Sequence, residues 1–325
     1  MMIEILPLIR LLREAASFAA IWLSTWLLLF LVLWLVYPLL RKLLLGWHPA
    51  SSSNVLLALL ALPFCVSLLA TTLLFGGLLE YNVLTTHYHG SDCESHFPRL
   101  QSAWAIGGVL GLTSIALLSM GTKFLTNLFA SRTLRERLSL LGDQREQWCL
   151  LPNEARLVFT LGWLRNTIFI TEGLLSQCSE EDIAIILAHE RAHAQRKDNL
   201  RLLASRLLLL VVPGPMARRF SDDMHLFCEA ACDFATATRH GALNVAETLL
   251  RIQRLVPEHF TCFNRTFASA FTGAEVEGRV LFLLEGDANA RSALFKPWMF
   301  LVLLALLSLV LVDPMHHIVE LLLDG

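Results

Sequence analysis

The sequence predicts a mainly α-helical integral membrane protein, in which about four transmembrane helices accompany one water-facing α+β domain. Composition is the first reason, because the 325 residues are 55% hydrophobic and only 17% charged, whereas soluble domains carry about 25% charged residues. Charge distribution is the second, because all but five of the 26 Lys and Arg residues lie within residues 123–296. The formal net charge of −2 gives no reason to expect nucleic-acid binding.

Four uncharged apolar segments are candidates for the membrane spans. The first lies between Glu14 and Arg41; it is long enough to cross about 30 Å of hydrocarbon and too long for the core of a signal peptide. The other three are expected at about residues 54–79, 101–122 and 297–312. The chain then divides into a three-span membrane region (1–122), a polar domain inserted between spans three and four (123–296), and a fourth span with a short tail (297–325).

The Lys and Arg residues beside the spans predict the orientation, because they favour the cytoplasmic side of a membrane. Arg41 and Lys42 follow the first span, and Lys123 with several arginines follows the third. The loop at 80–99 holds a single arginine, and the tail beyond the fourth span holds none. This asymmetry places the polar domain in the cytoplasm and both chain ends outside.

The polar domain contains the motif His-Glu-x-x-His at residues 189–193. Ser179 and the three acids that follow it predict the start of a helix, and positions i and i+4 share one helix face. His189 and His193 can therefore direct both imidazoles at one metal ion, while Glu190 can reach a water bound to that metal. The alternative is that the two histidines are solvated side chains of a charged helix.

A second pair of residues at helical spacing, Glu229 and Asp233, ends the segment "HLFCEAACD". In zinc peptidases of the gluzincin type, a Glu on a second helix completes the ligand set, and an acid one turn later hydrogen-bonds a ligand histidine. We therefore expect a gluzincin-like domain with one Zn²⁺ per chain, held by His189, His193 and Glu229 and supported by Asp233. Cys228 and Cys232 lie about 100° round the helix from these acids and are interpreted as small buried hydrophobic residues. A solvated acidic helix face is the alternative.

A peptidase also needs a strand that can pair with an extended substrate by β-augmentation. The β-branched and aromatic residues of "ARLVFTLGWLRNTIFIT" (155–171) predict one or two short strands before the helix. The candidate substrate-binding residues form the expected edge strand: Phe159, Thr160, Leu161, Gly162 and Trp163. The alternative is a hairpin of the domain core, and the two interpretations are compatible.

A zinc ion held by two imidazoles and one carboxylate keeps a position for a water whose pKa falls to ~7. Glu190 is the expected catalytic base, which takes a proton from this water and passes it to the leaving amine. The developing oxyanion also needs a donor, and all three tyrosines lie outside the polar domain. His225, one turn before Glu229, is the candidate donor, and a surface histidine is the alternative interpretation.

These motifs resemble those of the BlaR/MecR-type membrane metallopeptidases, the antirepressor proteases of β-lactam sensing. The resemblance runs through "FTLGWLRNTIFITEGLLSQCSEEDIAIILAHERAHAQRKDNL" and "CEAACD", and the order of spans and polar domain also agrees. It implies zinc ligands His189, His193 and Glu229, the catalytic base Glu190 and the supporting acid Asp233. Arg196 and Asp198 match a basic-x-Asp pair of that family.

The resemblance also implies a location and a kind of partner. It implies a multi-pass protein of the bacterial inner membrane, with the active site facing the cytoplasm. The implied substrate is a protein or peptide, such as a repressor or a membrane-bound factor. The sequence leaves the oligomeric state open.

The chain departs from the antibiotic-sensing members of that family, which carry a large extracellular penicillin-binding domain after the last span. About a dozen residues, "DPMHHIVELLLDG", follow the fourth expected span, and they contain no Ser-x-x-Lys motif. We therefore expect the protease module without direct β-lactam sensing.

Two other functions stay open. HtpX-type quality-control peptidases pair the same motif with a downstream Glu, although they usually lack the Cys of Glu-x-x-Cys-Asp. A non-catalytic signalling protein could use zinc to hold its domain together, although structural zinc sites are usually closed by four protein ligands. Separately, the loop with His87, His89, Cys93 and His96 could bind a metal ion or simply be polar.

Overall fold

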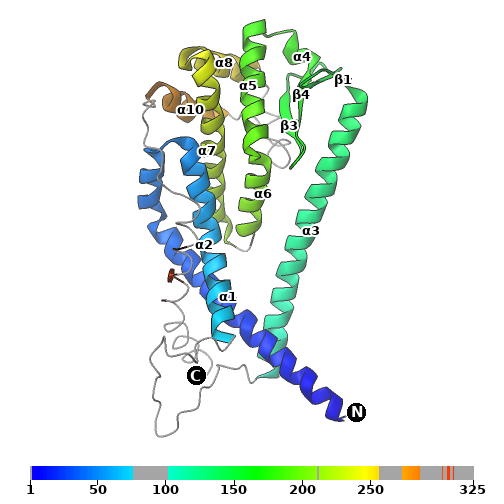
Figure 1. The fold of residues 1–325 in the computed structure, drawn as a ribbon, viewed down its shortest axis with the longest axis vertical. Coiled ribbons are helices and arrows are strands. Elements are labelled where there is room, and N and C mark those ends of the chain that lie inside the picture. The colour runs from blue at the N-terminus through cyan, green and yellow to red at the C-terminus, as the bar shows by residue number, and fades with distance from the viewer. Residues whose placement is uncertain are drawn as a thin grey trace. The chain divides into compact units, whose positions relative to one another are not determined.

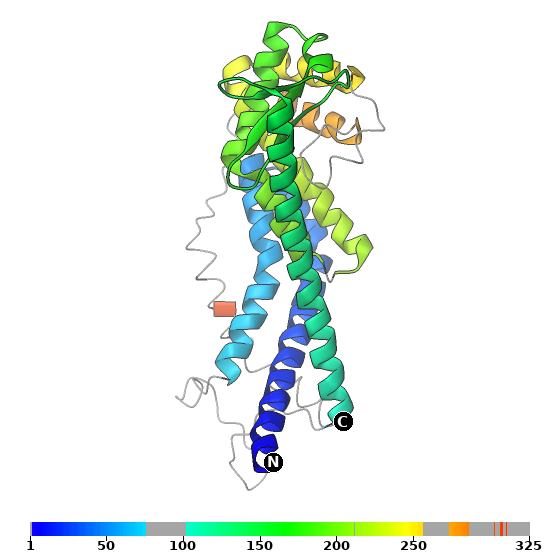
Figure 2. The ribbon, with the colours of Figure 1, turned by 90° about the vertical axis from the view of Figure 1, so that its right-hand side faces the viewer.

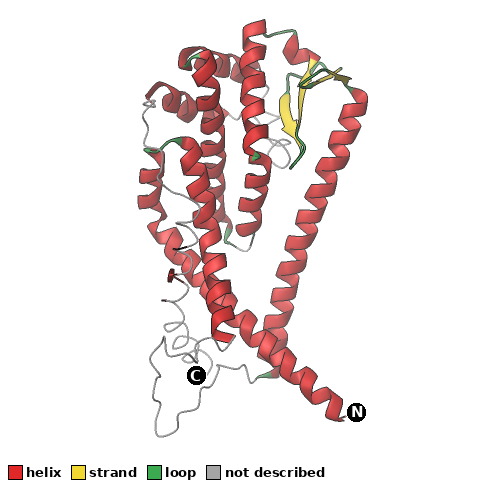
Figure 3. Ribbon diagram, viewed as in Figure 1, coloured by secondary structure: helices red, strands yellow, loops and turns green. Residues whose placement is uncertain are grey.

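The structure is a computed structural model (Figure 1). It describes residues 2–75, 102–210, 212–255 and 273–285, with the single positions 302, 306, 307 and 310. The chain forms two compact units: residues 1–39, 58–119 and 295–325 make one, and residues 40–57 and 120–294 make the other. Helices predominate among the described residues, and the strands gather in one small sheet (Figure 3).

Among the described residues, three helices are long and apolar enough to cross a membrane, over Pro7–Leu45, Pro49–Leu73 and Ala103–Leu141. They belong to α1 (Met2–Leu45), α2 (Pro49–Phe75) and α3 (Ala103–Leu141). The first three predicted spans are therefore present as helices. Apart from a few single positions, the fourth predicted span lies outside the described residues, and so does the whole loop that contains His87 and Cys93.

Helix α3 does not stop where the predicted third span ends. The span was expected to finish before Lys123, but α3 continues to Leu141 as one unbroken helix (Figure 2). No glycine or proline interrupts residues 122–141, so nothing breaks the helix where the sequence becomes polar. Leu134 and Leu138 then pack against the sheet, which makes the end of α3 part of the core of the second unit.

The sheet has four strands in the order β1-β2-β4-β3. The strands are β1 (Asp143–Gln144), β2 (Cys149–Leu151), β3 (Val158–Leu161) and β4 (Thr167–Thr171). β4 pairs parallel with β2 and antiparallel with β3, so β3 is an edge strand. Gly162 turns this hairpin at a φ of +117°, where a Cβ atom would lie 2.1 Å from the carbonyl oxygen of Arg165. β3 and β4 are the two strands that the sequence predicts.

Helix α5 lies between the sheet and helices α7 and α8 (Figure 1). The helices are α4 (Glu172–Leu175), α5 (Glu180–Arg196), α6 (Asp198–Leu208), α7 (Gly214–His240), α8 (Ala242–Leu255) and α10 (Gly273–Glu285). Ile186 and Leu187 of α5 pack against Ile168 and Ile170 of the sheet. Ile185, on another face, packs against residues of α8 and α10. This central position buries the side chains of the His-Glu-x-x-His motif.

Both ends of α5 are defined by local contacts. Ser179 caps the start, because its side chain and that of Asp182 accept each other's backbone N–H groups; this confirms the predicted helix start. At the other end Lys197 adopts a left-handed conformation, with a φ of 56°, and α6 begins at the next residue. A non-glycine residue in this conformation costs about 1–3 kcal/mol. The turn brings Asp198 back against the last turn of α5, beside His193.

Candidate metal centre

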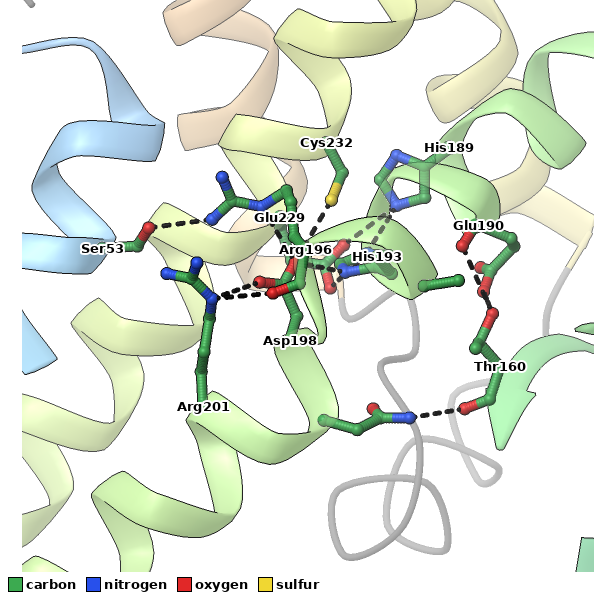
Figure 4. A network of polar contacts seen from close by, with 12 residues as sticks. Ser53, Thr160, His189, Glu190, His193, Arg196, Asp198, Arg201, Glu229 and Cys232 are labelled. Carbon is green, nitrogen blue, oxygen red and sulfur yellow. Dashed lines mark hydrogen bonds and ion pairs between the residues drawn. The ribbon is translucent and has the colours of Figure 1, made fainter. Parts of the chain in front are cut away.

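Helix α5 presents His189 and His193 side by side, one turn apart (Figure 4). Their Nε2 atoms are 3.0 Å apart, and each residue is 3% exposed. The spacing of the motif thus brings both imidazoles to one buried point.

Glu229 reaches the same point from helix α7. Its Oε2 atom lies 3.5 Å from Nε2 of His189, and its Oε1 atom lies 3.3 Å from Nε2 of His193. A zinc ion with tetrahedral bonds of about 2.0–2.1 Å holds neighbouring ligand atoms about 3.3 Å apart. The separations of 3.0, 3.3 and 3.5 Å between these atoms lie around that value. The three side chains therefore fit one zinc ion.

The pKa of the buried Glu229 carboxyl is lowered, which favours its ionised form. Burial by itself raises its pKa, but the charges of His193 and Arg279 outweigh this effect and hold the pKa well below its usual range. An anionic carboxylate between two imidazoles is the donor set that zinc prefers.

A buried carboxylate orients each histidine from behind. Nδ1 of His189 lies 2.9 Å from Oδ1 of Asp233, and Nδ1 of His193 lies 2.9 Å from Oδ2 of Asp198. Both contacts suit a proton on Nδ1, which leaves Nε2 to face the metal group. Asp233 lies where the sequence predicts the supporting acid. The role of Asp198 was missed, because the contact depends on the left-handed turn at Lys197.

Arg279 of α10 is a further member of the centre that the sequence analysis did not find. It is fully buried and donates from Nε and Nη2 to the two carboxylate oxygens of Asp233, both at 2.7 Å. Its Nη1 atom lies 3.0 Å from Oε2 of Glu229. One guanidinium therefore lies against both the candidate ligand Glu229 and the supporting acid Asp233, although it is about fifty residues further along the chain.

A second group, His193, Asp198 and Cys232, also lies close enough to hold a metal. The thiol of Cys232 instead donates to Oδ2 of Asp198 at 3.3 Å. Burial raises the pKa of this thiol to about 12, so it stays protonated, whereas zinc binds the thiolate. Cys228 and Cys232 are almost fully buried, in agreement with their interpretation as small hydrophobic residues.

Glu190 faces strand β3 and meets Thr160 there (Figure 4). Its Oε2 atom accepts a hydrogen bond of 2.6 Å from the Thr160 hydroxyl, and Glu190 is 2% exposed. Asn199 of α6 then holds the strand, because its side-chain amide donates to the carbonyls of Thr160 and Gly162 at 3.0 Å each. The strand and the acid beside the metal group are thereby fixed to each other.

The remaining candidate residues, which the sequence predicts for substrate binding and for the oxyanion, are not part of the metal group. Leu161 is buried and packs together with Phe159 in the core between the sheet and α3, while Trp163 is 9% exposed. These side chains are buried or nearly so, as the core-hairpin alternative expects, and among the described residues β3 pairs with β4 alone. His225 is half-buried on α7 and belongs to neither metal-binding group among the described residues.

Replacing Asp198 with asparagine is expected to weaken zinc binding about 10–100-fold, because a neutral amide holds the imidazole of His193 less firmly. The measurement is a competition titration of the detergent-purified full chain against a chelator. Asp222→Asn, at an exposed position of α7, is the matched control. Equal affinities in the two variants would contradict the role given to Asp198.

Comparison with known proteins identifies one family. A family model described as BlaR1 peptidase M56 matches residues 3–283, which cover the three apolar helices and all residues of the metal centre. No curated protein matches the chain.

Proposed function

The chain belongs to the BlaR1 peptidase M56 family, and we propose that it acts as a zinc metalloendopeptidase of the membrane. The family makes it a membrane-associated metallopeptidase. The observation that carries the finer proposal is the closeness of the donor atoms: the two imidazole Nε2 atoms are 3.0 Å apart, and the two carboxylate oxygens of Glu229 lie 3.5 Å from one and 3.3 Å from the other, which suits a single zinc ion bound by His189, His193 and Glu229.

Held by His189, His193 and Glu229, zinc would supply Lewis acidity, lowering the pKa of a water to about 7 and polarising the scissile carbonyl. The protein supplies the rest. Glu190 accepts a proton during the attack on the carbonyl and returns it to the leaving amine. Asp233 and Asp198 keep the two histidines aimed at the metal.

Thr160 orients this base. Thr160→Val removes the hydroxyl that donates to Glu190 while keeping the shape of the side chain. A hydrogen bond to a charged group contributes about 1.5–3 kcal/mol, so kcat is expected to fall about tenfold or more while zinc affinity is unchanged. Thr160→Ser keeps the donor and is expected to retain most of the activity. If the valine and serine variants have the same kcat, the hydroxyl does not orient Glu190.

The proposed substrate is a cytoplasmic or membrane-proximal protein or peptide, cleaved at one or a few sites as in regulatory or processing proteolysis. Support comes from the resemblance to antirepressor proteases and from the distribution of positive charges, which favours a cytoplasmic position of the polar domain. The proposed setting is the bacterial inner membrane. The edge of β3 would pair with the substrate backbone.

The test compares membranes that contain the protein before zinc removal, after zinc removal and after zinc is restored. New protein N-termini are labelled and identified in each sample. Cleavages that disappear and return with zinc support the peptidase. A few cleaved proteins indicate a regulator, and many indicate quality control. No zinc-dependent cleavage, with zinc bound, would favour a structural role for the metal.

A further inference from the structure

The carboxylate of Asp198 is the hub of a buried network that extends away from the metal group (Figure 4). Asp198 is 0% exposed. Its Oδ2 atom contacts Nδ1 of His193 at 2.9 Å and accepts from Nε of Arg196 at 3.2 Å. Arg196 in turn donates from Nη2 to the hydroxyl of Ser53 at 2.8 Å. Ser53 lies near the start of α2, and it is also 0% exposed.

A second arginine runs parallel to the first. Nε of Arg201 lies 3.5 Å from Oδ1 of Asp198 and donates to the carbonyl of Arg196 at 2.9 Å. Its Nη1 group donates to the side-chain oxygen of Asn54, the residue next to Ser53. Two guanidinium groups therefore each contact both Asp198 and the start of α2.

The turn between α1 and α2 also binds the helix that carries Glu229. Nε of Arg41, in α1, donates to both carboxylate oxygens of Asp223 in α7, at 2.8 and 3.0 Å. The ring of His48 packs on that of Phe234, with ring centroids 5.5 Å apart. Residues 40–57 thus belong to the same compact unit as the metal centre, and they contact the elements that carry its ligands.

The hydroxyl of Ser53 orients the guanidinium of Arg196 toward Asp198. A guanidinium is planar, and its N–H groups point in fixed directions, so the acceptor on one side fixes how the other side meets its partner. The side chain of Arg196 is 17% exposed, so little water is available to replace a lost acceptor. Without Ser53 the guanidinium can rotate away from Asp198, and the imidazole of His193 then loses part of its support.

We infer that Ser53 is a positioning residue of the metal centre, which acts through Arg196 and Asp198 on His193. This inference rests on the proposed function only in taking zinc as the metal. The start of α2 then helps to hold the metal ligand His193 in place. A movement of this end of the helix would change how His193 is oriented.

The experiment measures zinc retention in the full chain in detergent. Zinc-loaded protein is mixed with excess chelator, and the rate of zinc loss is recorded. Ser53→Val and Ser53→Thr have the same shape, but the threonine keeps a hydroxyl for Arg196. Mutating a residue that hydrogen-bonds a metal ligand typically lowers metal affinity about 10–100-fold. Ser53 is further from the metal than such a residue, because it reaches His193 only through Arg196 and Asp198. Zinc loss is therefore expected to be about three- to tenfold faster in the valine variant and close to wild type in the threonine variant.

Two controls separate positioning from a general loosening of the fold. Ser51→Val alters a partly exposed serine of the same helix and is expected to leave zinc loss unchanged. In an Arg196→Ala background, Ser53→Val is expected to add nothing, because the connection is already broken.

The inference is overturned if the valine and threonine variants lose zinc at the same rate, or if Ser53→Val has its full effect without Arg196. A wild-type chain that binds no zinc would instead contradict the proposed function. The two failures are therefore distinguishable.

Discussion

Replacing Arg279 with leucine is expected to cause the largest loss of stability of any single substitution at the centre. The guanidinium is fully buried and binds both oxygens of Asp233 as well as Glu229. Its removal leaves two buried carboxylates without their cation, and breaking a buried ion pair in this way costs about 3–5 kcal/mol. The cation also holds the pKa of Asp233 below its usual range against the effect of burial.

The measurement is thermal unfolding of the metal-free full chain in detergent, because bound zinc would offset part of the lost charge. Arg279→Lys keeps the charge but loses the planar guanidinium group. Its unfolding midpoint is expected to lie between those of Arg279→Leu and the wild type. Arg254→Leu, at an exposed position of α8, is the control for loss of an arginine. An unfolding midpoint of Arg279→Leu equal to that of Arg254→Leu would contradict the prediction.

Replacing Glu190 with glutamine is expected to lower kcat about 10²–10⁴-fold while zinc stays bound. The amide cannot accept the proton that the carboxylate would take, but it has the same shape and can still accept the hydrogen bond from Thr160. Glu190 contributes to neither metal-binding group among the described residues, so zinc affinity is expected to stay close to wild type.

The assay is turnover of an identified substrate by the purified variant, with bound zinc quantified in the same sample. Glu181→Gln, at an exposed position in the first turn of α5, is the matched control. Full activity of Glu190→Gln would exclude the role of catalytic base. Loss of zinc together with activity would mean that Glu190 supports the metal instead.

The residues that the sequence analysis brings to the metal centre are those related by helical spacing. His189 and His193, and likewise Glu229 and Asp233, are four residues apart on one helix, and this relation is local. The sequence does not reveal by itself that the two helices meet. That step came from the comparison with gluzincin-type zinc peptidases, and the structure places the two pairs together.

The contacts that were missed depend on tertiary structure. Asp198 reaches His193 because Lys197 adopts a left-handed conformation, which the sequence does not indicate at a lysine. Arg279 and Ser53 come from distant segments and form no motif with the residues they contact. Thr160 was selected for its place on the edge strand, but its hydroxyl contacts Glu190. For α3, the sequence predicts the end of a span near residue 122 but not the end of the helix, because a change from apolar to polar residues ends a span without ending a helix.

The coordination of the bound zinc tests the central claim most directly. X-ray absorption of the zinc-loaded full chain is expected to show two imidazole nitrogens with oxygen donors, all at about 2.0–2.2 Å, and no sulfur. That result leaves a position for the catalytic water. A sulfur neighbour at about 2.3 Å would place Cys232 or another thiolate on the metal. Such a site would contradict the open centre of His189, His193 and Glu229.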